Sequence, residues 1–204
     1  MADQLYLSLW FPNFRLTSLA PALVSILHQL TAAGGATTVS AAAAYPFSWN
    51  ETPVYQRIYE DDDIETAMPE VAVAEATQML HDDFAYEFEM KWDLWTPETA
   101  GGLDTVWRLE PRTIRIIGFG PQFDAGSYEQ NGHIRVDLGT DTAFLQEDVD
   151  LDEEAAAHVQ QNVERLVNFT NAVQANALIS TRLLWSESGE NLAEKLIQRL
   201  QRLN

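Results

Sequence analysis

The sequence contains no cysteine. This absence excludes disulfide bonds, cysteine-ligated zinc, iron–sulfur clusters and thiol nucleophiles. Long apolar runs are missing as well: residues 19–27 are interrupted by Pro21 and Ser25, and a membrane-spanning helix needs roughly 20 apolar residues. Near the start of the chain, Asp3 and Gln4 stand where a secretory signal carries positive charge. We therefore expect a cytoplasmic protein without a membrane span.

Basic residues are scarce. Lys and Arg together number 12 against 31 Asp and Glu, so the formal net charge at pH 7 is −19. Such a charge repels phosphate backbones, and the sequence has no basic stripe with interleaved aromatic residues. We therefore expect no nucleic-acid partner, and a basic protein is the partner that the charge favours. Net charge far from zero also keeps a protein dispersed without specifying any partner.

The residues that build a core are plentiful. Hydrophobic residues make up 46% of the chain, and six Trp, six Tyr and nine Phe are far more than disordered segments carry. The excess of acidic residues therefore lies on a packed protein. A chain of 204 residues can form one large domain or two small ones.

The first half of the chain shows both strand and helix periodicities. Apolar residues alternate with polar ones over residues 83–95, as in a strand with one buried face. The order of elements is strand, helix, strand, strand, helix, strand. It predicts a ferredoxin-like βαββαβ module over residues 1–96, with an antiparallel sheet and both helices on one face. The predicted strands are 5–11, 37–47, 53–60 and 83–95, and the predicted helices are 19–30 and 64–80.

The second half, residues 103–204, is predicted to be a ββαβα unit. A short connection over 97–102 is too brief for a free linker, so we expect the two halves to pack as one unit. A long-looped hairpin comes first, with a break at Glu110-Pro111. Asp150 and Glu153 form a capping box for a long helix, and Ser188 caps a final helix. The predicted strands are 106–109, 112–119, 134–138 and 182–186, and the predicted helices are 150–178 and 188–204.

The hairpin loop over residues 119–132 is the best candidate for a ligand- or partner-binding site. It is far longer than the usual two to five residues, and its glycines permit unusual backbone angles. Phe123 and Tyr128 are placed to anchor the loop or to cover a ligand, with Asp124 and His133 as polar groups. The alternative is an ordered surface loop that its own aromatic residues hold in place.

Familiar catalytic and metal-binding motifs are absent or incomplete. The four histidines lack the spacing of a helical metal motif, and neither a Gly-x-Ser-x-Gly nor a Gly-x-Gly-x-x-Gly sequence occurs. Residues 148–152 resemble the start of a calcium-binding loop, but Glu153 and Val159 stand where that loop needs glycine and glutamate. We therefore predict no catalytic residue, no metal and no cofactor.

The outward register of the predicted strands carries polar and aromatic residues. An antiparallel sheet with helices on one face leaves its other face open to ligands or partners. The alternative is that helices of the second half cover this face, because exposed aromatic residues are costly in water. The residues expected on this face are Glu87, Glu89, Asp93, His133, Arg135 and Asp137, with Tyr6, Trp10 and Trp95.

Three hypotheses for function follow. The first, favoured by the charge and the missing catalytic motifs, is a non-catalytic acidic interaction protein that binds a basic protein partner. The second is a small-molecule-binding protein or an enzyme of unrecognised type, with a pocket between the open sheet and the 119–132 loop. The third is a homo-oligomeric structural protein that pairs through strand edges.

Overall fold

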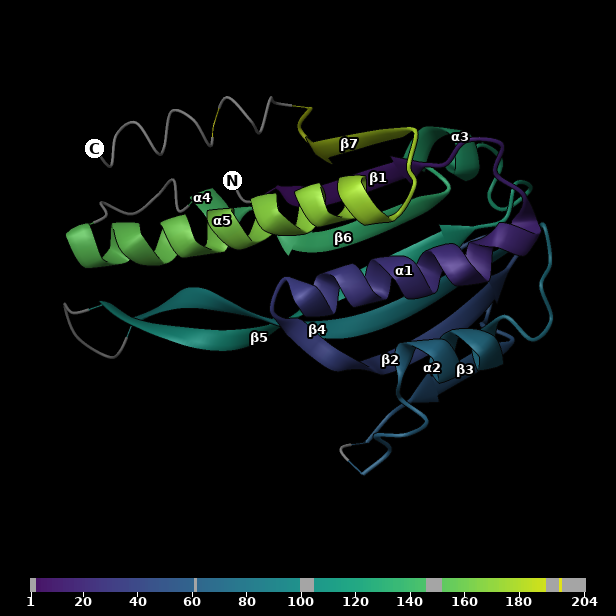
Figure 1. Cartoon of the computed structure of the whole chain (residues 1–204), viewed down its shortest axis with the longest axis horizontal. Coiled ribbons are helices and arrows are strands. Elements are labelled where there is room, and N and C mark those ends of the chain that lie inside the picture. Colours follow the sequence, from purple (N-terminus) through teal and green to yellow (C-terminus); the bar gives the residue numbers. More distant parts are fainter. Residues whose placement is uncertain (1–2, 61, 100–104, 146–151, 190–194, 196–204) are drawn as a thin grey trace.

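A computed structural model describes residues 3–60, 62–99, 105–145, 152–189 and 195 (Figure 1). Seven strands form one antiparallel sheet in the order β3-β2-β4-β5-β6-β1-β7. The strands are β1 Gln4–Trp10, β2 Gly35–Pro46, β3 Tyr55–Ile58, β4 Phe84–Thr99, β5 Thr105–Phe119, β6 Ile134–Thr140 and β7 Thr181–Ser186. The helices are α1 Leu19–Ala32, α2 Pro69–Ala76, α3 Ser127–Asn131, α4 Thr142–Leu145 and α5 Glu153–Asn176, with a 3₁₀ turn at Leu16–Ser18.

The predicted α+β class and antiparallel sheet are confirmed, but the strand order does not confirm the ferredoxin-like arrangement predicted for residues 1–96. β1 pairs with β6 and β7, both from the second half of the chain, and β5 and β6 separate it from β4. Alternation along a strand specifies which of its faces is buried but not which strand lies beside it. Both halves of the chain therefore contribute strands to one sheet.

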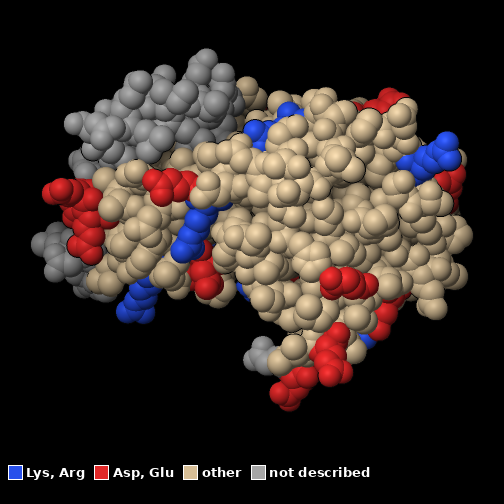
Figure 2. All heavy atoms as spheres, in the orientation of Figure 1, with Lys and Arg blue, Asp and Glu red and all other residues tan. Residues whose placement is uncertain are grey.

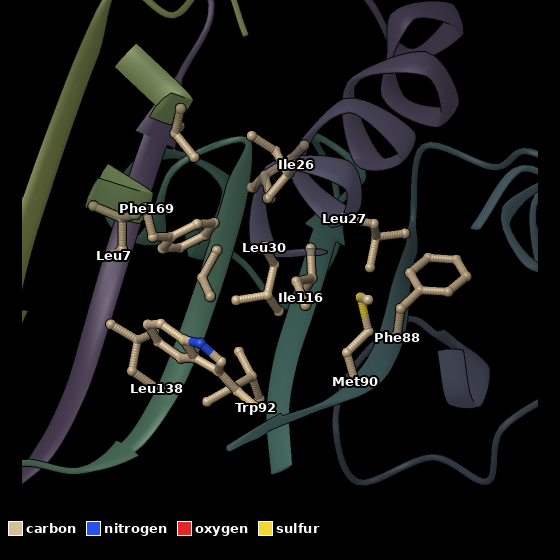
Figure 3. Close-up of a cluster of buried hydrophobic side chains, with 14 of the residues drawn as sticks. Leu7, Ile26, Leu27, Leu30, Phe88, Met90, Trp92, Ile116, Leu138 and Phe169 are labelled. Carbon is tan, nitrogen blue, oxygen red and sulfur yellow. The ribbon is translucent and has the colours of Figure 1, made fainter. Parts of the chain in front are cut away.

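The long helices α1 and α5 and the shorter α2 lie on one face of this sheet (Figure 1). In α1, buried residues recur three or four positions apart, as on the apolar face of an amphipathic helix. Trp92 of β4 and Phe169 of α5 pack edge to face, with ring centroids 6.0 Å apart. Figure 3 shows the core between the layers, including Leu7, Ile26, Leu27, Leu30, Phe88, Met90, Trp92, Ile116, Leu138 and Phe169.

β4 and β5 extend as a two-stranded hairpin beyond the rest of the sheet (Figure 1). The predicted break at Glu110-Pro111 is wrong, because Pro111 lies within β5 and pairs with Asp93. β6 pairs with β5 only over Arg115–Gly118. Among the described residues, one side of β5 at Pro111 therefore has no neighbouring strand, and a missing backbone N–H can be tolerated there.

The boundaries of two helices differ from the predictions. α2 runs from Pro69 to Ala76, so it is shorter at both ends than the helix predicted over 64–80. Pro69 lies in its first turn, where a missing backbone N–H is tolerated. The N-cap of α5 is Asp152, whose carboxylate accepts a hydrogen bond from Ala155 N–H at 2.8 Å. Asp150, the predicted cap, and almost all of the final helix predicted after Ser188 lie outside the described residues. No described helix combines the length and apolarity that a membrane crossing requires.

A buried polar side chain fastens α5 to the base of the outer hairpin. Asn162 is fully buried. Its Oδ1 accepts a hydrogen bond from Trp95 N–H at 2.9 Å, and its Nδ2 donates to the carbonyl oxygens of Trp95 and Ala143 at 2.9 and 2.8 Å. One side chain thus satisfies three backbone groups where α5 covers β4.

We expect Asn162→Ala to lower the free energy of unfolding by about 3 kcal/mol, because it leaves three backbone groups without partners. Urea denaturation measures the loss. Gln174→Ala is the matched control, since Gln174 lies on the exposed side of the same helix. Equal losses in the two variants would show that the Asn162 hydrogen bonds contribute no net stability.

Candidate functional site

The 119–132 loop is fastened to the neighbouring strands through its backbone. Gly120 N–H donates to Phe84 O, and Gln122 N–H donates to Asp82 O, both at 2.7 Å. Asp124 N–H donates to Phe47 O at 2.8 Å. A Cβ at Gly120 would lie 2.4 Å from the carbonyl oxygen of Asp82, so only glycine permits this close approach. The loop is thereby held against the end of the sheet.

Phe123 anchors the loop from inside. Its side chain is fully buried and belongs to a small cluster with Ala85, Ile117 and Phe119. The Trp49 ring meets the Phe123 ring edge-on at 5.1 Å. This cluster is separate from the main core, and it covers one end of the face of the sheet that α1, α2 and α5 leave uncovered.

His133 and Tyr128 lie in an aromatic stack. The His133 ring lies 4.4 Å from the Phe14 ring and 4.5 Å from the Tyr128 ring. Its Nδ1 accepts a hydrogen bond from Phe11 N–H at 3.0 Å, and burial lowers the pKa of His133. Asp124, the fourth predicted site residue, is exposed and has a left-handed backbone with φ of 42°. Of the four residues, the structure therefore brings Tyr128 and His133 into contact, buries Phe123 and leaves Asp124 in solvent.

A groove of about 760 Å³ lies beside this region, on the same face of the sheet. Its floor is β2, where Ala41 and Ala43 point away from the helices. Glu87 and Glu89 of β4 pair with Ala43 and Ala41 and form one wall. The opposite wall and the two ends are formed by Gln56, Ile58, Glu60, Ile64 and Tyr45. Two methyl side chains between longer neighbours thus produce the hollow.

The two wall carboxylates differ in their surroundings. Glu89 Oε1 accepts a hydrogen bond from Arg115 Nε at 3.0 Å. Glu87 is half-buried and accepts no hydrogen bond within the described part of the chain. Burial raises the pKa of Glu87, an effect that Arg115 partly offsets. Burial and the nearby Glu87 raise the pKa of Tyr45, at one end of the groove.

A second ion pair lies on the same face toward β1. Arg135 binds Asp137 through two hydrogen bonds of 2.7 and 3.2 Å. The Arg135 guanidinium also lies over the Tyr6 ring, 4.9 Å from its centroid. Burial raises the pKa of Asp137, while the adjacent Arg135 opposes that shift. Arg135 therefore has its partners within the protein, in contrast to Glu87.

The predicted outward register agrees with the structure for most of its members. Glu87, Glu89 and Asp137 lie on the open face, and among the described helices α1, α2 and α5 cover the other one. Trp95 differs, since its ring packs on His158 of α5 at 3.8 Å and its Nε1 donates to Gln161. The groove itself was missed. The sequence feature that produces the groove is the alanine run 41–44. In the sequence, this run indicated only a weak strand-forming tendency and gave no sign of a hollow.

Comparisons with protein-family models, with curated proteins and with solved structures found no match to this chain. Among the described residues, no three His, Asp or Glu side chains are grouped closely enough to hold a metal ion. The lining of the groove includes three carboxylates, two cationic side chains, two tyrosines and apolar surface.

We expect the carboxyl group of Glu87 to titrate above the ordinary glutamate pKa, and Arg115→Gln to raise this pKa further. The reason is that the Arg115 charge favours the ionised form. Side-chain carboxyl ¹³C NMR measures both values. Arg108→Gln is the control, because Arg108 is 63% exposed on the outer hairpin. A wild-type pKa at or below the ordinary value would contradict the described burial of Glu87.

His133 makes stability depend on pH in a defined direction. Its folded-state pKa lies below its ordinary value of 6.5, so the unfolded chain takes up a proton first as the pH falls. The stability associated with neutral His133 is fully present above 6.5 and is lost as pH falls toward the lowered pKa. We expect this part of the pH dependence to vanish in His133→Gln, measured by urea denaturation across this range. An unchanged profile would contradict a buried neutral imidazole.

Proposed function

We propose that this chain is a non-catalytic interaction protein that binds a basic segment of a partner protein in the groove on its open sheet face. The observation that carries the proposal is the lining of the groove. Three carboxylates, those of Glu60, Glu87 and Glu89, surround a floor of alanine. Arg115 is already paired with Glu89, and Lys91, the other cation of the lining, donates to the Thr113 hydroxyl. The three carboxylates still outnumber the two cations, so the lining favours a cationic occupant.

The shape of the groove suits an extended chain. Its walls stand on β3 and β4, one strand to either side of β2, so they are about 10 Å apart. Ile58 and Ile64 are 71% and 62% exposed and offer apolar contacts at the side away from β4. A segment that alternates basic and apolar side chains therefore matches a groove with one acidic wall and one apolar wall.

The surrounding charge supports the same kind of partner. Acidic side chains gather on the segment between β3 and α2, seen at the bottom of Figure 2. They continue the acidic lining beyond Glu60 at the edge of the groove. A net charge of −19 also raises the rate at which a basic protein meets this one at low salt. The acidic residues of this segment include Glu60, Asp62, Asp63 and Glu65.

The second hypothesis, a small-molecule pocket at the 119–132 loop, has less support. Phe123 is fully buried and cannot meet a ligand without leaving its packing. Tyr128 is stacked on His133, which also stacks with Phe14 and Phe11. These contacts favour an anchoring role for the loop aromatics, beside a groove that lies elsewhere on the face.

An immobilised peptide library that samples basic, neutral and acidic sequences of equal length tests the proposal. We expect the wild type to retain basic peptides, with affinity that falls steeply as salt increases. Ala41→Leu should weaken this binding about tenfold, because the larger side chain fills the floor of the groove without changing any charge.

Glu154→Gln is the matched control, since it removes one charge from α5 at a side chain that is 85% exposed. It should change affinity by less than about twofold. Thermal unfolding checks that both variants fold as the wild type does. If Ala41→Leu binds as well as the wild type, basic peptides bind the acidic surface in general, and the groove is not the site.

A further inference from the structure

We infer that the groove selects arginine, and that the guanidinium of the bound segment lies between the Glu87 carboxylate and the Tyr45 ring. This inference deepens the proposed function and rests on it, because it names the residue that the groove recognises. It is carried by the position of one half-buried carboxylate beside one aromatic ring in the lining of the groove.

Glu87 is the wall carboxylate with capacity to accept a ligand. Glu89 already accepts from Arg115 at 3.0 Å, and Glu60 is exposed to water at the rim. Glu87 is half-buried and has no hydrogen-bond donor within the described residues. A charged hydrogen bond to a partly desolvated carboxylate is stronger than one to an exposed carboxylate, and a bidentate pair adds geometric specificity.

Tyr45 supplies the second contact. Tyr45 pairs with Ala85, and Ala43 pairs with Glu87, so Tyr45 and Glu87 are diagonal neighbours on one face of two adjacent strands. Diagonal neighbours lie about 7–8 Å apart, a separation that a planar cation can bridge. The Tyr45 ring is supported by Trp49, with centroids 5.2 Å apart. The ring is therefore held in place before any ligand binds.

The floor leaves room for the guanidinium. Ala43 lies between Gln56 on β3 and Glu87 on β4, and it contributes only a methyl group. A long side chain that enters over Ala43 meets Glu87 along one edge and Tyr45 at its end. Arginine fits this geometry better than lysine, because its planar fork donates two parallel hydrogen bonds and stacks on aromatic rings.

The charges that face Glu87 do not cancel its attraction for a cation. Arg115 is hydrogen-bonded to Glu89, and Arg135 is hydrogen-bonded to Asp137. Each nearby guanidinium is thus matched by its own carboxylate, and Lys91, the remaining cation of the groove, donates to the Thr113 hydroxyl at 2.6 Å. The charge of Glu87 is left for the ligand. Binding requires ionised Glu87, and burial raises the pKa of this group. Affinity should therefore decline as the pH falls through that raised pKa.

The test is a double-mutant cycle between the full chain and a basic peptide retained in the library experiment. Each arginine of the peptide is replaced in turn by citrulline, which keeps the shape and removes the charge, and by lysine. Binding to the wild type, Glu87→Gln and Glu154→Gln is measured by calorimetry, over a range of pH. Tyr45→Leu, which keeps apolar bulk, is a second variant for the ring contact.

We expect citrulline at one position to weaken binding to the wild type at least about tenfold, and lysine to weaken it less. The same citrulline replacement should cost Glu87→Gln almost nothing, because the interaction partner is already gone. Glu154→Gln should respond as the wild type does. The pH dependence should be present in the wild type and absent in Glu87→Gln.

Two results separate failure of this inference from failure of the proposed function. If Ala41→Leu blocks binding but no arginine position is coupled to Glu87, the groove binds a basic segment by another contact and this inference is wrong. If Ala41→Leu also has no effect, the proposed function itself fails. Equal tolerance of arginine, lysine and citrulline at every position would likewise overturn the inference.

Discussion

The pairing of β1 between β6 and β7 is the constraint on which the rest of the structure depends. Leu5, Leu7 and Leu9 alternate along β1 and are fully buried under the helix layer, and β1 is paired with a strand on each side. β1 joins residues near the start of the chain to residues beyond 180 and gives β7 its only partner strand among the described residues. Without the pairing of β1, the sheet would be interrupted beneath the helix layer, and α5 would have less apolar surface to pack against.

The sheet divides the chemistry of the protein between its two faces. On one face, the apolar side chains of β4, β5 and β6 pack against the helices α1, α2 and α5. On the other face, the cluster around Phe123 covers one end, and ion pairs such as Arg135–Asp137 occupy the middle. The groove over Ala41 and Ala43 lies where small side chains separate longer ones. The charged side chains and the groove therefore lie on the same face of the sheet, opposite the helices.

Local patterns predicted the elements that have strong periodicity, and they failed where a neighbour decides the outcome. The amphipathic spacing of α1 and the alternation of β4 predicted both elements closely. The partners of β1 could not be predicted, because alternation carries no information about adjacent strands. Pro111 was predicted to break the strand because proline has no backbone N–H to donate. A strand tolerates proline where no neighbouring strand needs that donor, and the sequence does not show that β6 ends before Pro111. The outward position of Glu87 was predictable, but the hollow beside it depends on the register of β2 against β3 and β4.

The alternation within β2 has an evolutionary consequence. Ala42 and Ala44 face the core, whereas Ala41, Ala43 and Tyr45 face the groove, so consecutive codons of one strand encode two unrelated surfaces. Substitutions at Ala41 or Ala43 change the shape of the groove, while neither residue belongs to the core under the helices. Substitutions at Ala42 or Ala44 change the packing of that core instead. The shape of this groove can therefore diverge by single steps that natural selection on folding does not oppose.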